Sequence, residues 1–283
     1  MNYVGAIAGY IYQGNVDNCS FDGSVQGRQL CGGVVGALLG TEGTPVSITN
    51  CHGTGVVIGS NNEIGGVVGQ AEYATVSGCS YTGDVKSNVP QTNNSIGGIV
   101  GLAQYSHFNE CSFNGNVQGS SSLGGIVGRS QYAGDITNCS AEGTIDGLSN
   151  LGGIVGLIGG TDEQYSTISN NHSQCSIVGA SNHIGGVFGF LDRSNISGCS
   201  FAGYVEGQQY AGGIAGYFRY GTMEDCSAEC TVVGTTDCGG IAGYAFGTSA
   251  VDMVFRRNYA KVDVTGGDTH DNTGGAFGRL NYA

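Results

Sequence analysis

The sequence predicts an all-β fold, more narrowly a right-handed parallel β-helix or β-solenoid of about nine coils that spans residues 1–283 as a single domain. Three observations predict it: 55 glycines in 283 residues, a glycine pentapeptide that recurs along the chain, and a strand-like pattern between its copies. Each interior glycine costs a helix about 1 kcal/mol relative to alanine, which excludes long helices. With only 2 prolines, a collagen-like chain is excluded as well.

The recurring pentapeptide is Gly-Gly-apolar-apolar-Gly, with variants GAIAG and GGAFG as its first and last copies. Successive copies begin 27 to 35 residues apart, and 27 or 28 is the commonest interval. A fixed period of this length marks a repeat architecture in which each unit stacks on the next. The ten copies span 5–9, 32–36, 65–69, 97–101, 124–128, 152–156, 185–189, 212–216, 239–243 and 274–278.

A second pattern fills the space between the pentapeptides, with ITNCSAEGTIDG at 136–147 and FNECSFNGNVQG at 108–119 as its best copies. Short strands that end at Gly or Asn and recur at a fixed period favour a parallel solenoid. Coils stacked about 4.8 Å apart would turn equivalent residues into rows, and nine of them would make a rod of about 43 Å.

Four apolar rows predict the core. Two of them run through the pentapeptide: Ile7, Val34, Val67, Ile99, Ile126, Ile154, Val187, Ile214, Ile241, Ala276 and Ala8, Val35, Val68, Val100, Val127, Val155, Phe188, Ala215, Ala242, Phe277. The other two are Ile48, Val76, Phe108, Ile136, Ile168, Ile196, Met223 and Val25, Val57, Val85, Val117, Ile145, Ile177, Val205, Val232, Val264.

The two pentapeptide rows are adjacent in sequence, so the chain either bends between them or is buried on both faces there. Glycine favours the bend, because we expect it to supply positive φ and close backbone approach. The predicted structural turn glycines are Gly32, Gly33, Gly65, Gly66, Gly97, Gly98, Gly124, Gly125, Gly152, Gly153, Gly185, Gly186, Gly212, Gly213, Gly239, Gly240, Gly274 and Gly275.

The repeat unit resembles the GLUG repeat over essentially the whole chain. The resemblance lies in the order GGIVG, a short polar loop, an N-x-C-S-x-x-G-x-V strand and a further GGIVG. That repeat occurs in bacterial cell-surface and adhesin-like proteins and in non-catalytic regions of some IgA-specific metallopeptidases. The resemblance implies a β-solenoid on an extracellular surface protein, and it implies no enzymatic residue. The sequence departs from a typical member in its cysteines.

Seven of the 11 cysteines share one phase of the repeat, where Asn171 and Asn258 stand in two other coils: Cys19, Cys51, Cys79, Cys111, Cys139, Cys199 and Cys226. Of the others, Cys31 and Cys238 precede a Gly-Gly pair, and Cys175 and Cys230 replace a turn glycine.

A ladder of buried thiols is the favoured interpretation of the seven. Metal binding is disfavoured because Cys226 and Cys230 form a lone C-x₃-C and no paired C-x₂-C exists. Disulfides are disfavoured because the Cβ atoms of in-register rows lie about 4.8 Å apart, whereas a disulfide needs about 3.8 Å. The redox state of the other four cysteines stays open. So many reduced thiols suit a reducing or anaerobic setting, so a surface protein of this kind would belong to an anaerobic bacterium or archaeon.

No catalytic, cofactor-binding or metal-binding residue is predicted. The five histidines occupy different phases, and the acidic residues at the phase that begins with Asp22 are diluted by neutral ones. Calcium would need repeated G-G-x-G-x-D, which is missing. Ice binding would need regular Thr rows, but the phase that begins with Thr49 is irregular. A net charge of −13 argues against nucleic acid and anionic membranes, and no apolar run predicts a membrane span. No signal-peptide pattern follows Met1.

Tyr73, Tyr105 and Tyr132 fall at one phase in three consecutive coils, and Tyr220 and Tyr282 share it. They form either an aromatic contact row for sugars or a partner, or a cross-strand ladder that only stabilises the stack. Insertions, where recognition usually sits, fall at 37–47, 86–95 (with the polar turn 88–94), 157–167, 244–254 and 265–272.

The favoured function is a non-enzymatic structural and adhesion module, a rigid rod or display scaffold. The alternatives are a filament subunit that stacks end to end and a carbohydrate-active β-helix enzyme. The partners expected are a second copy, a cell-surface protein or a glycan. The sequence shows no polar caps, so we expect either an excised piece of a longer solenoid or ends that pair with neighbouring copies.

Overall fold

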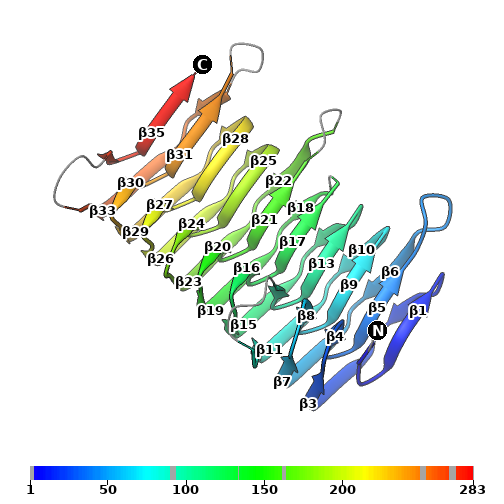
Figure 1. Ribbon diagram of the computed structural model, residues 1–283. Coiled ribbons are helices and arrows are strands. Elements are labelled where there is room, and N and C mark those ends of the chain that lie inside the picture. The colour runs from blue at the N-terminus through cyan, green and yellow to red at the C-terminus, as the bar shows by residue number, and fades with distance from the viewer. Residues whose placement is uncertain are drawn as a thin grey trace.

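The computed structural model describes residues 3–89, 94–132, 134–160, 164–248, 253–267 and 272–282, and these contain strands and no helix. About nine coils stack in chain order, so that the two ends of the chain lie at opposite ends of the stack (Figure 1). All pairings between named strands are parallel and join equivalent residues of successive coils, as in Val57 with Val85 and Val85 with Val117. The predicted parallel β-solenoid is confirmed.

Each coil contributes strands to three sheets. Sheet C holds the N-x-C-S-x-x-G-x-V segments as β3 (Ser20–Gly27), β7 (His52–Gly59), β11 (Ser80–Ser87), β15 (Ser112–Gln118), β19 (Ser140–Gly147), β23 (His172–Gly179), β26 (Ser200–Glu206), β29 (Ser227–Val233) and β33 (Tyr259–Thr265). Sheet A holds the short strands that enter the pentapeptide: β4 (Cys31–Gly32), β8 (Glu63–Gly65), β12 (Ser95–Gly97), β16 (Ser121–Gly124), β20 (Ser149–Gly152), β24 (Asn182–Gly185), β27 (Gln209–Gly212), β30 (Thr236–Gly239) and β34 (Thr273–Gly274).

Sheet B follows the pentapeptide and has two segments in most coils. The first comprises β1 (Ala8–Tyr12), β5 (Val35–Leu39), β9 (Val68–Glu72), β13 (Val100–Gln104), β17 (Val127–Gln131), β21 (Val155–Gly159), β31 (Ala242–Gly247) and β35 (Phe277–Tyr282). The second comprises β2 (Val16–Asp17), β6 (Val46–Thr49), β10 (Ala74–Ser77), β14 (His107–Asn109), β18 (Ile136–Thr137), β22 (Ser166–Ser169) and β32 (Met253–Arg256). Two strands run through both: β25 (Phe188–Ser197) and β28 (Ala215–Glu224).

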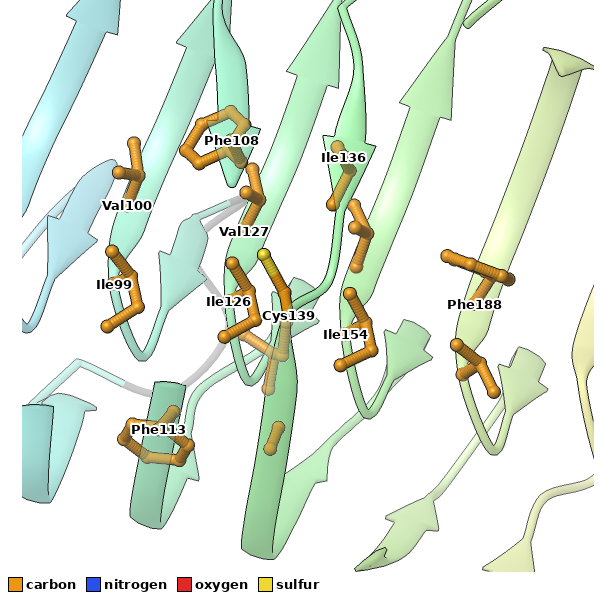
Figure 2. Close-up of a cluster of buried hydrophobic side chains, with 14 of the residues drawn as sticks. Ile99, Val100, Phe108, Phe113, Ile126, Val127, Ile136, Cys139, Ile154 and Phe188 are labelled. Atoms are coloured by element: carbon orange, nitrogen blue, oxygen red, sulfur yellow. The ribbon is translucent and has the colours of Figure 1, made fainter. Parts of the chain in front are cut away.

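The chain bends inside the pentapeptide, between sheet A and sheet B, so of the two arrangements that the sequence left open the structure has the bend. The bend turns both apolar rows inward: Ile99, Val100, Ile126 and Val127 are fully buried. Figure 2 shows Ile99, Ile126 and Ile154 in register at successive bends. The core therefore runs along the axis, enclosed by the three sheets.

One expectation about the pentapeptide is wrong: none of its glycines has positive φ. Glycine is required at these positions because other backbone atoms approach the Cα too closely to leave room for a Cβ. A Cβ on the first glycine of a copy, such as Gly65, would overlap the carbonyl oxygen of Val68. A Cβ on the second, such as Gly98, would overlap both the carbonyl of Gly125 in the next coil and the ring of Phe113.

Left-handed backbone occurs at three other corners of the coil. One corner lies at the start of sheet A, as at Leu30 (φ 48°) directly before β4, and one just before the cysteine phase, as at Asn138 (φ 55°). The third separates the two segments of sheet B, and the tyrosine row stands there, with Tyr73 at φ 47°, Tyr105 at 49° and Tyr132 at 64°. Asn and Gly accept this conformation at little cost, whereas a bulky side chain is strained in it.

Sheet C also contributes a fifth inner row that the sequence pattern did not predict, because its residues vary from large to small: Phe21, Gly53, Tyr81, Phe113, Ala141, Ser173, Phe201, Ala228 and Ala260. The large rings pack on the second glycine of the pentapeptide, as Phe113 does on Gly98. The glycine two residues later is crowded by the preceding coil and by the ring: a Cβ on Gly203 would overlap the carbonyl oxygen of Cys175 and lie 3.0 Å from the ring of Phe201.

Two of the unusual cysteines stand two residues after small members of this row, Cys175 after Ser173 and Cys230 after Ala228, whereas the small residues Gly53 and Ala141 are followed by glycine. Cys175 is fully buried, and the Sγ of Cys230 lies 3.0 Å from the Cβ position of Gly213. A thiol thus fills volume that a ring fills in other coils, as close packing of a protein interior requires.

Candidate functional site

The tyrosine row forms a stacked aromatic ladder on the outside of sheet B. The ring centroids of Tyr73 and Tyr105 are 4.5 Å apart with planes 6° from parallel, and those of Tyr105 and Tyr132 are 4.7 Å apart and 13° from parallel. Tyr105 and Tyr132 remain 37% and 40% exposed. Loss of surrounding solvent, and then the Tyr105 phenol, raise the pKa of the Tyr73 hydroxyl.

A groove of about 480 Å³ runs beside this ladder and crosses four coils: it is lined by Tyr73, Tyr105, His107, Tyr132, Gly134, Asp135, Gln164 and Tyr165. We call it the tyrosine groove. His107 and Asp135 supply its polar side, with Nδ1 of His107 3.3 Å from the Asp135 carboxylate and both side chains half exposed. The backbone N–H of Asp135 donates to the same Nδ1 at 3.2 Å. The groove therefore combines aromatic edges, hydroxyls and a hydrogen-bonding pair.

No described aromatic side chain of the coil after Tyr132 stacks on the ladder. Gln131 pairs with Gly159, so Gly160 occupies the rung that would follow Tyr132, and a Cβ on Gly159 would meet open space. Tyr132 therefore has one ring face covered by Tyr105 and no stacking partner on the other among the described residues. Tyr220, at the same phase further on, instead lies beneath the guanidinium of Arg193 at 5.0 Å.

A second aromatic cluster, built from side chains of sheets A and B, was not predicted. Phe190 and Tyr217 stack 5.1 Å apart, His183 and Tyr210 stack 5.4 Å apart, and Tyr244 packs on Tyr217 edge to face. Its members come from two different phases, so no single row of the sequence signals it. Next to it, Asp192 is nearly buried and accepts hydrogen bonds from the guanidinium groups of Arg193 and Arg219.

The cysteine phase lies at the entrance to sheet C. Six of its seven cysteines are buried and Cys19 is half buried, and no disulfide joins any of the eleven cysteines. The thiols bond to carbonyls two residues earlier, as Cys51 does to Thr49 at 3.2 Å. Asn171 takes this phase in one coil and ties it to the preceding coil, since its Oδ1 accepts from the N–H of Cys139 at 2.9 Å and its Nδ2 donates to the carbonyl of Ile136 at 2.8 Å.

The expectation that every histidine has its own phase is wrong, because His52 and His172 share one row, but they lie four coils apart in it. His52 and His172 each bond a serine of the next coil, Ser80 at 2.8 Å and Ser200 at 2.7 Å. His183 bonds Asn150, and burial lowers its pKa to about 4. His270 and most of the polar turn 88–94 fall outside the described residues, and so does the side chain of Tyr282. Across the described ranges, no group of three His, Cys, Asp or Glu side chains is placed to hold a metal ion, and no helix is long and apolar enough to cross a membrane.

Comparison with known families gives one result. Residues 2–26, 60–86 and 119–146 match the model of the GLUG motif. Each matched segment is one coil, which enters through a pentapeptide and ends in a sheet C strand. Searches of curated proteins and of solved structures find no match. The coils between and after the three matched ones have the same order of strands, so this chain is a parallel β-solenoid that contains three GLUG-motif repeats.

Proposed function

We propose that the chain is a non-enzymatic structural module, a rigid rod that holds its outer faces and insertions for contact with a partner outside the cell. The observation that carries the proposal is the uninterrupted core: the rows through Ile99 and Val100 are buried in every coil from the second to the ninth. Successive coils are tied by parallel ladders in all three sheets. Recognition residues usually lie on loops and faces that such a scaffold positions.

Placement at a cell surface and use in adhesion are part of this proposal, and the GLUG repeats support them. Surface biotinylation of intact cells of the source organism tests the location. The proposal expects the protein to be labelled without lysis. Labelling only after lysis would contradict it.

The scaffold role itself is tested by grafting. Thr41 and Thr44 close a surface turn by two backbone bonds of 3.0 Å, and a Cβ on Gly43 would meet nothing within 4 Å. Replacing 42–43 with a ten-residue epitope tag should leave the melting temperature within a few degrees and expose the tag to its antibody, because loop closure costs little extra with length. Loss of the cooperative melting transition would contradict a scaffold role.

End-to-end assembly is a second candidate, favoured by the first coil. Ile7 is 51% exposed, whereas its row mates Val34 and Val67 are fully buried. A stacked coil would cover it, whether from a second copy or from more of the same polypeptide. If a second copy does so, light scattering should show a mass that rises with concentration. A constant 28.7 kDa would reject self-assembly of this chain.

A further inference from the structure

The tyrosines of the tyrosine groove stand at a backbone conformation that does not favour tyrosine. Tyr73, Tyr105 and Tyr132 all stand at left-handed φ. The corner before the cysteine phase meets the same demand with Asn in coils such as those of Asn50 and Asn138. A non-glycine residue in this conformation costs on the order of 1 kcal/mol or more, and bulky ones are rare there. Three consecutive strained tyrosines beside a groove point to a role of the rings outside the fold.

We propose that the tyrosine groove binds a neutral linear saccharide laid along the axis of the solenoid, a proposal that rests on the role of the chain as a display scaffold. The groove volume of about 480 Å³ falls in the range typical of small-ligand sites, about 300 to 1,000 Å³. Its three rungs, 4.5 and 4.7 Å apart, repeat the same hydroxyl and ring edge in successive coils. A polymer of similar units matches such a repeat.

The lining selects for hydroxyl groups. The faces of Tyr105 are covered by Tyr73 and Tyr132, so it offers its edge and its phenol. His107 and Asp135 stand on the same groove and add a ring nitrogen and a carboxylate. The outer face of Tyr132, opposite Gly160, is an apolar surface on which the C–H face of a sugar ring can pack.

Charge excludes acidic ligands. Asp135 lines the groove, and the carboxylates of Glu42 and Glu72 lie near enough to Tyr73 to raise the pKa of its phenol. The chain as a whole carries −13. An extended peptide that added itself to a sheet would need a free strand edge, but the strands on this groove, β10, β14 and β18, are paired on both sides.

The test uses the full chain with chitohexaose and cellohexaose as neutral probes and hexagalacturonate as the acidic one, in titration calorimetry. We expect saturable binding of at least one neutral hexasaccharide and none of the acidic one. The variant Tyr105→Asn removes the central ring and keeps a residue that accepts left-handed φ. It should weaken binding at least tenfold. Its matched control is Tyr220→Asn, at the same corner but outside the groove, which should bind as the parent does.

Two results would overturn the proposal: neither neutral hexasaccharide binds at millimolar concentration, or Tyr105→Asn binds as tightly as Tyr220→Asn. Circular dichroism on each variant separates the two proposals. A folded chain that binds no neutral saccharide defeats the saccharide site and leaves the scaffold role standing. Failure of the grafted chain to fold would instead defeat the scaffold role.

Discussion

At the residue scale, the pentapeptide positions accept only glycine because a larger residue would overlap atoms of the neighbouring coil. Gly98 has no room for a methyl group, because it would overlap the Gly125 carbonyl and the Phe113 ring. Gly159 is the last residue of strand β21 in sheet B, and a methyl group there would meet nothing within 4 Å. The two positions make a matched pair for the same substitution.

We expect Gly98→Ala to lower the free energy of unfolding by several kcal/mol, the range of overpacking with backbone displacement. Gly159→Ala should change it by less than about 1 kcal/mol. Urea denaturation followed by circular dichroism measures both. Equal stabilities of the two variants would show that cross-coil contact does not set the requirement for glycine.

His183 makes a prediction about pH. Burial against Phe190, Tyr210 and Tyr217 lowers its pKa from 6.5 to about 4, so the unfolded chain binds a proton that the folded chain does not between those pH values. Its contribution to stability is therefore complete above pH 6.5 and is lost as pH falls towards 4. The loss amounts to at most about 3 kcal/mol.

The variant His183→Asn keeps a residue suited to the φ of 60° and removes the titrating group. Its free energy of unfolding should fall less steeply than that of the parent between pH 6.5 and 4. Denaturation midpoints at several pH values give the two slopes. Parallel slopes would mean that His183 is protonated in the folded chain as readily as in the unfolded one.

At the element scale, sheet C balances volume between residues two positions apart. Ser173→Phe alone should destabilise the chain by about 1–3 kcal/mol, because Cys175 already occupies the space. Adding Cys175→Gly recreates the Phe-x-Gly pair of the next coil, Phe201 and Gly203, and should recover at least about 1 kcal/mol. A double-mutant cycle measures the coupling. Strict additivity of the two changes would refute the exchange of a ring for a thiol.

The cysteine phase makes a prediction about reactivity. Burial raises the pKa of the Cys51 thiol to about 11, so the folded chain holds it as the unreactive thiol at neutral pH. Iodoacetamide should label Cys19, the half-buried end of the ladder, well before Cys51 in the native chain. Under denaturing, non-reducing conditions all seven cysteines of the phase should react. Peptide mass spectrometry that finds them paired would contradict a ladder of thiols.

Prediction from sequence succeeded where one chemical property persists at one phase. The rows through Ile99, Val100, Phe108 and Val117 are apolar in every coil, and all four are buried from the second coil to the eighth. The inner row that holds Phe113 was missed because its members range from Gly to Tyr, and only the neighbouring volume explains them. The expectation of positive φ at the pentapeptide glycines was wrong. Glycine is required there because a Cβ would overlap backbone carbonyl oxygens, and the periodicity of a sequence does not reveal such contacts. The groove was anticipated only as a row of tyrosines, since His107 and Asp135 stand at a phase with no repeated residue type.

At the scale of the whole molecule, the account makes one central claim: equivalent residues of successive coils lie in register along a rigid axis. The serines at the start of the sheet C strands offer positions for this test, because Ser20, Ser140, Ser200 and Ser227 share one row. Ser20 is separated from the other three by four, six and seven coils.

Pulsed electron–electron double resonance tests the claim most directly, because it measures the distances between two spin labels. Attaching the labels to unnatural amino acids at these serine positions leaves the cysteines unmodified. The account predicts narrow distributions for Ser20 to Ser140, Ser200 and Ser227, centred near ~19, ~29 and ~34 Å plus a constant linker offset, since each coil rises about 4.8 Å. Distances that fail to grow with the number of coils, or distributions many ångströms broad, would contradict a rigid in-register solenoid.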